Sequence, residues 1–66
     1  MTIVVNGKKV ACEHGLSLLQ YLEQQGVNPL TVVVERNRII VKAEAFGETG
    51  LEQGDELEIL QFVGGG

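Results

Sequence analysis

The chain has 66 residues, 44% of them hydrophobic, and a formal net charge of −4. A chain this short makes one domain that buries only about 60% of its unfolded surface, so there is little room for an active-site cleft and a binding or carrier module is favoured over an enzyme. The negative net charge argues against a nucleic-acid partner. The apolar runs are too short to span a membrane, and no basic segment followed by an apolar one suggests a secretory leader. The single cysteine cannot form a disulfide within the chain, which fits the reducing cytoplasm.

Residues 2–12 are predicted to form a β-hairpin. Asn6-Gly7 lies between two short strand-like segments, and this pair is typical of a two-residue type I′ turn, since both central residues need a positive φ. In that register Ile3 and Val10 face each other on the core side, together with Cys12. Cys12 is therefore expected to be a small buried hydrophobic residue.

Residues 17–25 are predicted to form a helix. Its start is signalled by a capping box, in which Ser17 is the N-cap and Gln20 the third helical residue. Gly26 suits the left-handed position after the last turn, and Pro29 prevents continuation. The apolar side chains that repeat at helical spacing are Leu18, Leu19 and Leu22.

Two more strands are predicted in the middle of the sequence. Thr31–Glu35 is β-branched with apolar side chains on both faces, which indicates a central strand. Arg36-Asn37 is the expected turn into a second strand over Arg38–Lys42. Ala43–Gln53 is polar and glycine-containing, and we expect a loop with room for one helical turn.

The last strand is predicted over Glu56–Phe62, after Gly54-Asp55. Alternation along it places Leu57 and Ile59 on one face. The opposite face changes from acidic to apolar side chains, in the order Glu56, Glu58, Leu60 and Phe62. An exposed apolar pair favours contact with a partner; the alternative is that another element of the chain covers it.

These elements predict an α+β domain over residues 1–62, in the order β-β-α-β-β-β. One helix packs across a mixed sheet of four to five strands, and the final strand lies beside the first. Residues 63–66 are expected to form a flexible glycine tail outside this domain.

Side chains suited to catalysis or metal binding are scarce. His14 has no neighbouring ligands, and no Cys–His spacing resembles a zinc site. The glycines of residues 47–54 lack the Gly-Lys-Ser/Thr ending of a phosphate-binding loop. We therefore expect no metal or cofactor on this chain, and a solvated acidic face made of Glu48, Glu52, Asp55, Glu56 and Glu58.

The last three residues are Gly64, Gly65 and Gly66, which have no side chain to bury. An α-carboxylate is ionised at neutral pH and must be activated before it can react, and this chain has no nucleotide site of its own. A glycine tether can pass through a channel too narrow for side chains, and residues 62–66 reach about 17 Å. The competing interpretation is an inert chain end.

The sequence is similar to the thiamine-biosynthesis sulfur carrier (ThiS-type) family, a branch of the ubiquitin-like β-grasp fold. The similarity covers the whole chain and rests on the segments Ile3–Gly7, Val32–Asn37, Gly54–Ile59 and Phe62–Gly66. A terminal Gly-Gly is shared by several β-grasp carriers, whereas the Phe-Val-Gly-Gly-Gly ending on so short a chain is more specific to the thiamine branch.

The resemblance implies a protein cosubstrate and not an enzyme. An adenylating (E1-like) partner that uses ATP and Mg²⁺ would convert Gly66 into an acyl-adenylate, and a persulfide from a donor such as a cysteine desulfurase would turn it into a thiocarboxylate. Thiazole synthase would then take the sulfur. Gly64 and Gly65 would thread into the partner's active site, with docking at Leu60, Phe62 and Val63.

Three alternatives stay open at this point. The chain could serve another pathway, like the small subunit of molybdopterin synthase, although such chains are usually longer. It could be a ubiquitin-like modifier that forms an isopeptide bond through Gly66, since activation would be the same and only the acceptor differs. It could also be a plain interaction domain with an inert tail.

Overall fold

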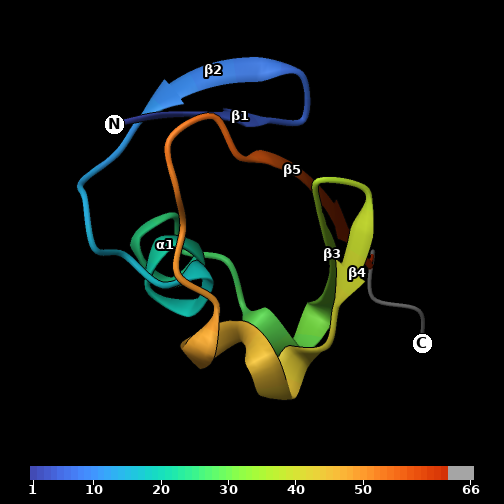
Figure 1. Cartoon of the computed structure of the whole chain (residues 1–66). Coiled ribbons are helices and arrows are strands. Elements are labelled where there is room, and N and C mark those ends of the chain that lie inside the picture. Colours follow the sequence, from blue (N-terminus) through green and yellow to red (C-terminus); the bar gives the residue numbers. More distant parts are fainter. Residues whose placement is uncertain (63–66) are drawn as a thin grey trace.

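A five-stranded mixed sheet curves around one α-helix in the computed structural model, which describes residues 1–62 (Figure 1). The strand order is β2-β1-β5-β3-β4; β1 and β5 are parallel and the other pairs are antiparallel. This confirms the predicted element order, while the predicted tail over residues 63–66 lies outside the described part. In chain order the elements are β1 (Thr2–Val5), β2 (Lys8–Ala11), α1 (Leu18–Gln24), the 3₁₀ helix η1 (Pro29–Thr31), β3 (Val32–Arg36), β4 (Ile39–Val41), the 3₁₀ helix η2 (Ala43–Glu48) and β5 (Glu56–Gln61).

The β1–β2 hairpin has the predicted register and turn. Ile3 pairs with Val10, and Asn6 and Gly7 have φ values of 49° and 83°, as a type I′ turn requires. Ile3 is fully buried. Cys12 was predicted to be buried but is only half-buried. It follows the edge strand β2, where the core covers it from one side only.

Helix α1 begins and ends where the capping signals predict. The Ser17 N–H donates to the Gln20 side chain at 2.9 Å, and the Gln20 N–H donates back to the Ser17 hydroxyl at 3.1 Å. Gly26 has a φ of +71° just after the helix. The buried side chains are Leu18, Tyr21 and Leu22, whereas Leu19, which was predicted on the same face, is half-buried.

Strand β3 is a central strand, as predicted, but its turn into β4 lies one residue later than expected. The positive φ values fall on Asn37 and Arg38, at 52° and 70°. Arg36 stays in the strand because its guanidinium Nε donates to the buried Asp55 carboxylate at 2.9 Å. Asn37 can take the turn because its short side chain tolerates the left-handed region.

The segment between β4 and β5 is more ordered than the sequence predicts. It holds η2, and its two large apolar side chains, Phe46 and Leu51, are buried in the core. The Leu18 N–H donates to the Thr49 carbonyl at 2.8 Å, and the Leu51 N–H to the Leu16 carbonyl at 2.9 Å. These bonds attach the segment to the start of α1.

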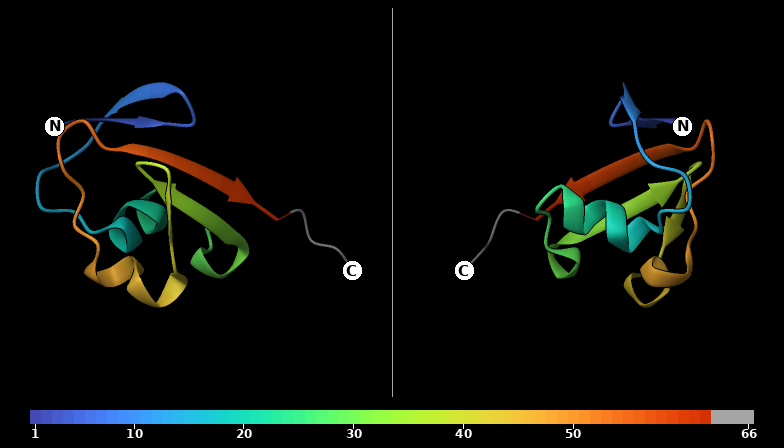
Figure 2. Two further views of the ribbon diagram at one scale, coloured as in Figure 1. Left: turned by 45° about the vertical axis from the view of Figure 1, so that its right-hand side comes forward. Right: turned by 90° about the vertical axis from the view of Figure 1, so that its left-hand side faces the viewer.

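The core lies between α1, η2 and the concave face of the sheet (Figure 2). No helix in the described part is both long and apolar enough to cross a membrane. The opposite, convex face of the sheet keeps its side chains at the surface, and this face positions the candidate site. The buried core side chains are Ile3, Leu18, Tyr21, Leu22, Val32, Val34, Phe46, Leu51 and Leu57.

Candidate functional site

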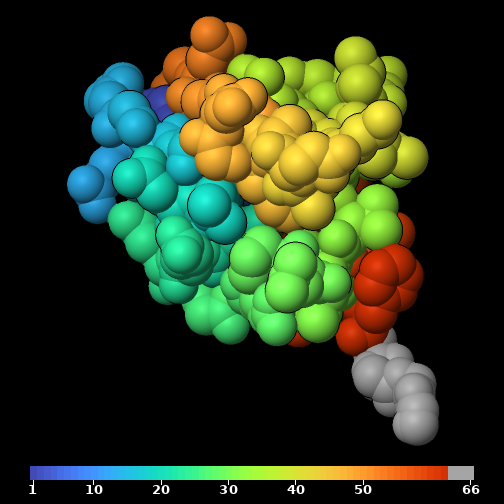
Figure 3. Space-filling model, turned by 90° about the horizontal axis from the view of Figure 1, so that it is seen from below, coloured from blue at the N-terminus to red at the C-terminus, as the bar shows by residue number. Residues whose placement is uncertain are grey.

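The convex side of β5 exposes the apolar pair that the alternation predicts. Leu57 is buried, whereas Leu60 and Phe62 are 64% and 63% exposed. The Phe62 N–H donates to the Thr31 carbonyl at 2.8 Å, which anchors the end of β5 to β3 while the ring stays outside. Seen from below, the end of β5 lies at the surface beside the start of β3 (Figure 3). The alternative that another described element covers the pair is wrong.

Two further apolar side chains share this convex face. Val33 of β3 lies directly opposite Leu60 of β5. Ile40 of β4, which is 64% exposed, lies opposite Glu35 of β3. We call the four residues the outer apolar patch: Val33, Ile40, Leu60 and Phe62. Sequence reasoning missed Val33 and Ile40, because strand pairing decides which side chains of neighbouring strands share a face. The signal that could have found them is the alternation of side chains along β3 and β4, aligned with the alternation along β5.

An acidic strip borders the outer apolar patch. Glu58 lies directly opposite Glu35, and Glu56 follows on the same face of β5. Like charges directly opposite each other in a sheet repel, so this pair favours the bound state of a partner that brings a cation. The convex face is therefore complementary to a surface that is apolar at its centre and basic at one side.

Asp55 does not belong to the solvated acidic face, contrary to the prediction, because it is 5% exposed. Its carboxylate accepts hydrogen bonds from the Glu52 N–H at 2.8 Å, the Arg36 Nε at 2.9 Å and the Asn37 Nδ2 at 3.1 Å. Burial by itself would raise the pKa of Asp55, but these hydrogen bonds and the Arg36 charge together lower it below its usual value. The other four members, Glu48, Glu52, Glu56 and Glu58, are exposed.

Asn6 holds β5 from the other side. Its side-chain oxygen accepts from the Ile59 N–H at 2.7 Å, and its Nδ2 donates to the Ile59 carbonyl at 3.2 Å. Asn6 therefore acts as one more residue of β1, although the sequence identified it only as a turn residue. With Asp55 at the start of β5 and Thr31 at its end, this contact makes β5 a firmly held base ahead of residues 63–66.

No three His, Cys, Asp or Glu side chains within residues 1–62 are grouped so as to hold a metal ion, and His14 is exposed. The remaining predicted site residues are the reactive Gly66, its tether Gly64 and Gly65, and the docking residue Val63. They lie outside the part of the chain that the structure describes, so their roles stay predictions.

Comparison with known proteins identifies a family and close structural relatives. A model of the ThiS family matches residues 3–66. A sulfur carrier protein ThiS from Bacillus subtilis is 36% identical over 63 residues, which cover 94% of this chain and 96% of that protein. A thiazole synthase from Paramagnetospirillum magneticum is 35% identical over all 66 residues, but the chain spans only 20% of that protein's length.

The fold has a solved counterpart. The crystal structure of a thiamine biosynthesis protein (ThiS) from Geobacter metallireducens superposes with a TM-score of 0.85 at 35% identity, and the match covers 100% of both chains. This similarity and the observed sheet order confirm the predicted ubiquitin-like β-grasp architecture.

Proposed function

This chain belongs to the ThiS family, and we propose that it is a sulfur carrier for thiamine (thiazole) biosynthesis whose reactive group is the carboxylate of Gly66. The family match carries the proposal, because it runs from residue 3 to residue 66 and so includes the glycine tail. In this role the chain is a cytoplasmic protein cosubstrate, and the catalysts are its partners.

The proposed chemistry begins with activation of Gly66. In an E1-like adenylating partner, which supplies the ATP and Mg²⁺ site, a carboxylate oxygen attacks the α-phosphate and releases pyrophosphate to give an acyl-adenylate. A persulfide from a cysteine desulfurase or similar donor attacks the acyl carbon and expels AMP. A second thiol then breaks the sulfur–sulfur bond of the acyl disulfide, which leaves a thiocarboxylate on Gly66 and a disulfide on the donor side.

Docking of the adenylating partner is proposed at the outer apolar patch, extended by Val63. Leu60 and Phe62 are exposed, and the backbone of β5 is held by Asn6 as far as Ile59 and by the Thr31 carbonyl at Phe62, so they offer a preorganised apolar surface next to the tail. Gly64 and Gly65 would carry Gly66 into the active site, since no side chain on them widens the path. The acidic strip favours a partner surface with Lys or Arg beside its apolar centre.

Thiazole synthase is the proposed acceptor of the sulfur. A region similar to this whole chain forms a fifth of the thiazole synthase from Paramagnetospirillum magneticum, so the two units occur in one polypeptide there. The thiocarboxylate suits the transfer because its sulfur is a soft, strong nucleophile. After the sulfur leaves, the carboxylate of Gly66 can be activated again.

The test is the intact mass of the chain after incubation with the adenylating enzyme of its own host, Mg²⁺-ATP and a persulfide donor. We expect the mass to rise by the difference between sulfur and oxygen, and fragmentation to place that change on Gly66. Omitting ATP is the control and should abolish the change. An unchanged mass with all components present would contradict the proposal, and attachment to a lysine of another protein would favour the modifier alternative.

A further inference from the structure

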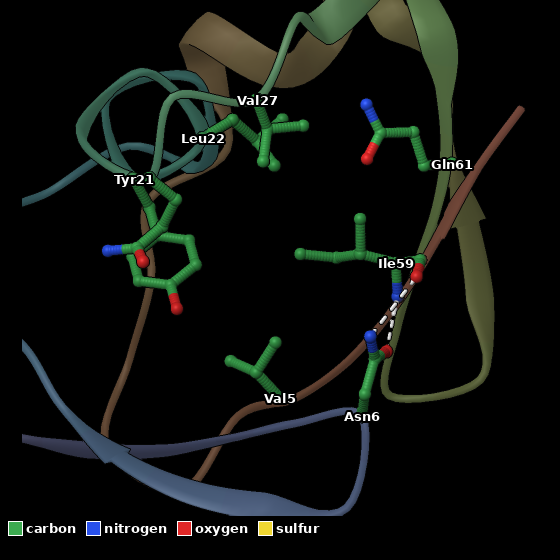
Figure 4. A pocket seen from close by; sticks show the side chains of 8 residues that line it. Val5, Asn6, Tyr21, Leu22, Val27, Ile59 and Gln61 are labelled. Carbon is green, nitrogen blue, oxygen red and sulfur yellow. Dashed lines mark hydrogen bonds between the residues drawn. The ribbon is translucent and has the colours of Figure 1, made fainter. Parts of the chain in front are cut away.

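A groove lies on the concave side of the sheet, between the C-terminal end of α1 and β5 (Figure 4). It has a volume of about 320 Å³ and is lined mainly by apolar side chains. It is separate from the outer apolar patch, because Ile59 points to the opposite face of β5 from Leu60. Its lining residues are Val5, Asn6, Tyr21, Leu22, Gln25, Val27, Ile59 and Gln61.

Tyr21 brings an unpartnered polar group into this groove. The residue is only 4% exposed, and its hydroxyl forms no hydrogen bond within residues 1–62. Every fully buried polar side-chain atom in this part of the chain has a hydrogen-bond partner. The Tyr21 hydroxyl has none, so it must reach solvent. It does so at the groove, where it points between Val5 and Ile59 (Figure 4). Because the hydroxyl reaches solvent at the groove and bonds no other described residue, it can form a hydrogen bond with a polar group of a ligand bound there.

The edge of β5 beside the groove is open. Strand β1 pairs with β5 only as far as Val5 and Leu57, and the Asn6 side chain then satisfies Ile59. Because the Phe62 N–H points to β3 and backbone groups alternate along a strand, the N–H and C=O of Gln61 point away from β3, to the groove side. No strand within the described residues pairs with Gln61 on that side. An extended peptide could therefore add a short strand there.

We propose that the groove and the Gln61 edge together bind an extended segment of thiazole synthase, whose backbone pairs with Gln61 and which inserts one medium-sized apolar side chain beside Tyr21. The inference rests on the proposed function. An enzyme that takes sulfur from Gly66 must approach this end of β5, because residues 62–66 span at most about 17 Å. Binding on the concave side leaves the outer apolar patch to the adenylating enzyme. No charged side chain lines the groove, so its occupant needs no charge.

The experiment compares four forms of the full chain in their affinity for thiazole synthase from the same organism: wild type, Gln61→Pro, Gln61→Ala and Tyr21→Phe. Proline removes the edge N–H without losing a bond to β3, and we expect binding to weaken about 10-fold or more. Alanine keeps the N–H and should bind within about twofold of wild type. Phenylalanine removes only the hydroxyl and should weaken binding about 2- to 10-fold. Hydrogen exchange of the Gln61 amide in the wild-type complex should slow.

The outcomes separate the groove from the proposed function. If wild type is adenylated but Gln61→Pro binds the synthase as well as wild type, or if the Gln61 amide gains no protection, the groove proposal is overturned. If wild type is not adenylated at all, the proposed function itself fails. Adenylation of the Gln61→Pro chain at the wild-type rate shows that its fold, patch and tail are intact. If that variant does not fold, Tyr21→Phe and the amide exchange of wild type decide.

Discussion

Asp55 is the one carboxylate buried within residues 1–62, and it joins three segments of the chain. It receives hydrogen bonds from Arg36 and Asn37 at the β3–β4 turn and from the Glu52 backbone. Because its folded pKa lies below its unfolded value of about 3.8, the stability that it contributes is fully present above that unfolded value. That contribution is lost as the pH falls through the lowered folded pKa.

We expect Asp55→Asn to reduce the free energy of unfolding by about 1.5–3 kcal/mol at pH 7, because charge-assisted hydrogen bonds are lost and the Arg36 charge keeps no buried partner. The deficit should be constant above about pH 5 and shrink below about pH 4, since wild type then loses the same contribution. Urea unfolding at several pH values measures this. Glu52→Gln is the control. It also removes a carboxylate beside Arg36, with 3.6 Å between Glu52 Oε2 and Arg36 Nη2, but the Glu52 side chain is 79% exposed. Parallel pH profiles for wild type and Asp55→Asn would contradict the assignment.

Asn6 permits a second test at the scale of one residue. Asn6→Gly keeps the positive φ of the turn but removes both side-chain bonds to Ile59, so we expect a loss of about 1–3 kcal/mol in urea unfolding. Asn28→Gly is the control, because it removes a local bond to the Leu30 N–H at 2.9 Å and should cost less. A loss for Asn6→Gly that is equal to or smaller than that for Asn28→Gly would contradict the stabilising role assigned to the link between Asn6 and β5.

Among the elements, β5 contributes to both the core and the proposed binding surfaces, because its two faces have different surroundings. The concave face contributes Leu57 to the core and Ile59 to the groove. The convex face presents Leu60 and Phe62 to solvent. A strand can serve both because successive side chains point to opposite faces.

We predict that Phe62→Asp weakens binding to the adenylating partner about 10-fold or more, because an apolar anchor at the centre of an interface typically costs over 1 kcal/mol when removed. Calorimetric titration measures the affinity. The matched control is Ile39→Asp, an equally drastic change at an exposed residue of β4 whose side chain lies on the other face from Ile40. The thermal midpoints of both variants should stay near wild type. Equal affinities for the two variants would rule out the outer apolar patch as the docking surface.

At the scale of the whole molecule, the described core and the proposed reactive group, Gly66, lie in different parts of the sequence. Within residues 1–62, the buried core side chains lie between Ile3 and Leu57. Changes after Phe62 should therefore leave the fold unaltered and alter only the reaction.

We predict that adding one alanine after Gly66 abolishes thiocarboxylate formation while the thermal midpoint of unfolding is unchanged. The acyl carbon is then displaced by one residue, about 3.5 Å, from the position that the partner activates. Intact mass and circular dichroism measure the two properties, and deletion of Gly66 is the companion variant. Thiocarboxylate formation on the extended chain would contradict the assigned role of Gly66.

Local patterns in the sequence were enough for the elements themselves. Asn6-Gly7 predicted the first turn, the Ser17 capping box predicted the start of α1, and alternation after Asp55 predicted which side chains of β5 are exposed. Each of these signals lies within a stretch of at most seven residues, so the unfolded chain already contains them. The family can also be identified from the sequence, because each similar segment, including the glycine ending, is an unbroken stretch of residues.

The tertiary structure alone decided what depends on distant segments meeting. Phe46 and Leu51 stand isolated in a polar stretch, and only their approach to α1 makes them core residues. Asp55 resembles its acidic neighbours until Arg36 and Asn37 arrive from 18 or more positions away. The outer apolar patch and the groove need strand pairing and helix placement, which short-range patterns do not encode. The sequence by itself determined the elements and the glycine ending, and packing determined which surfaces flank them.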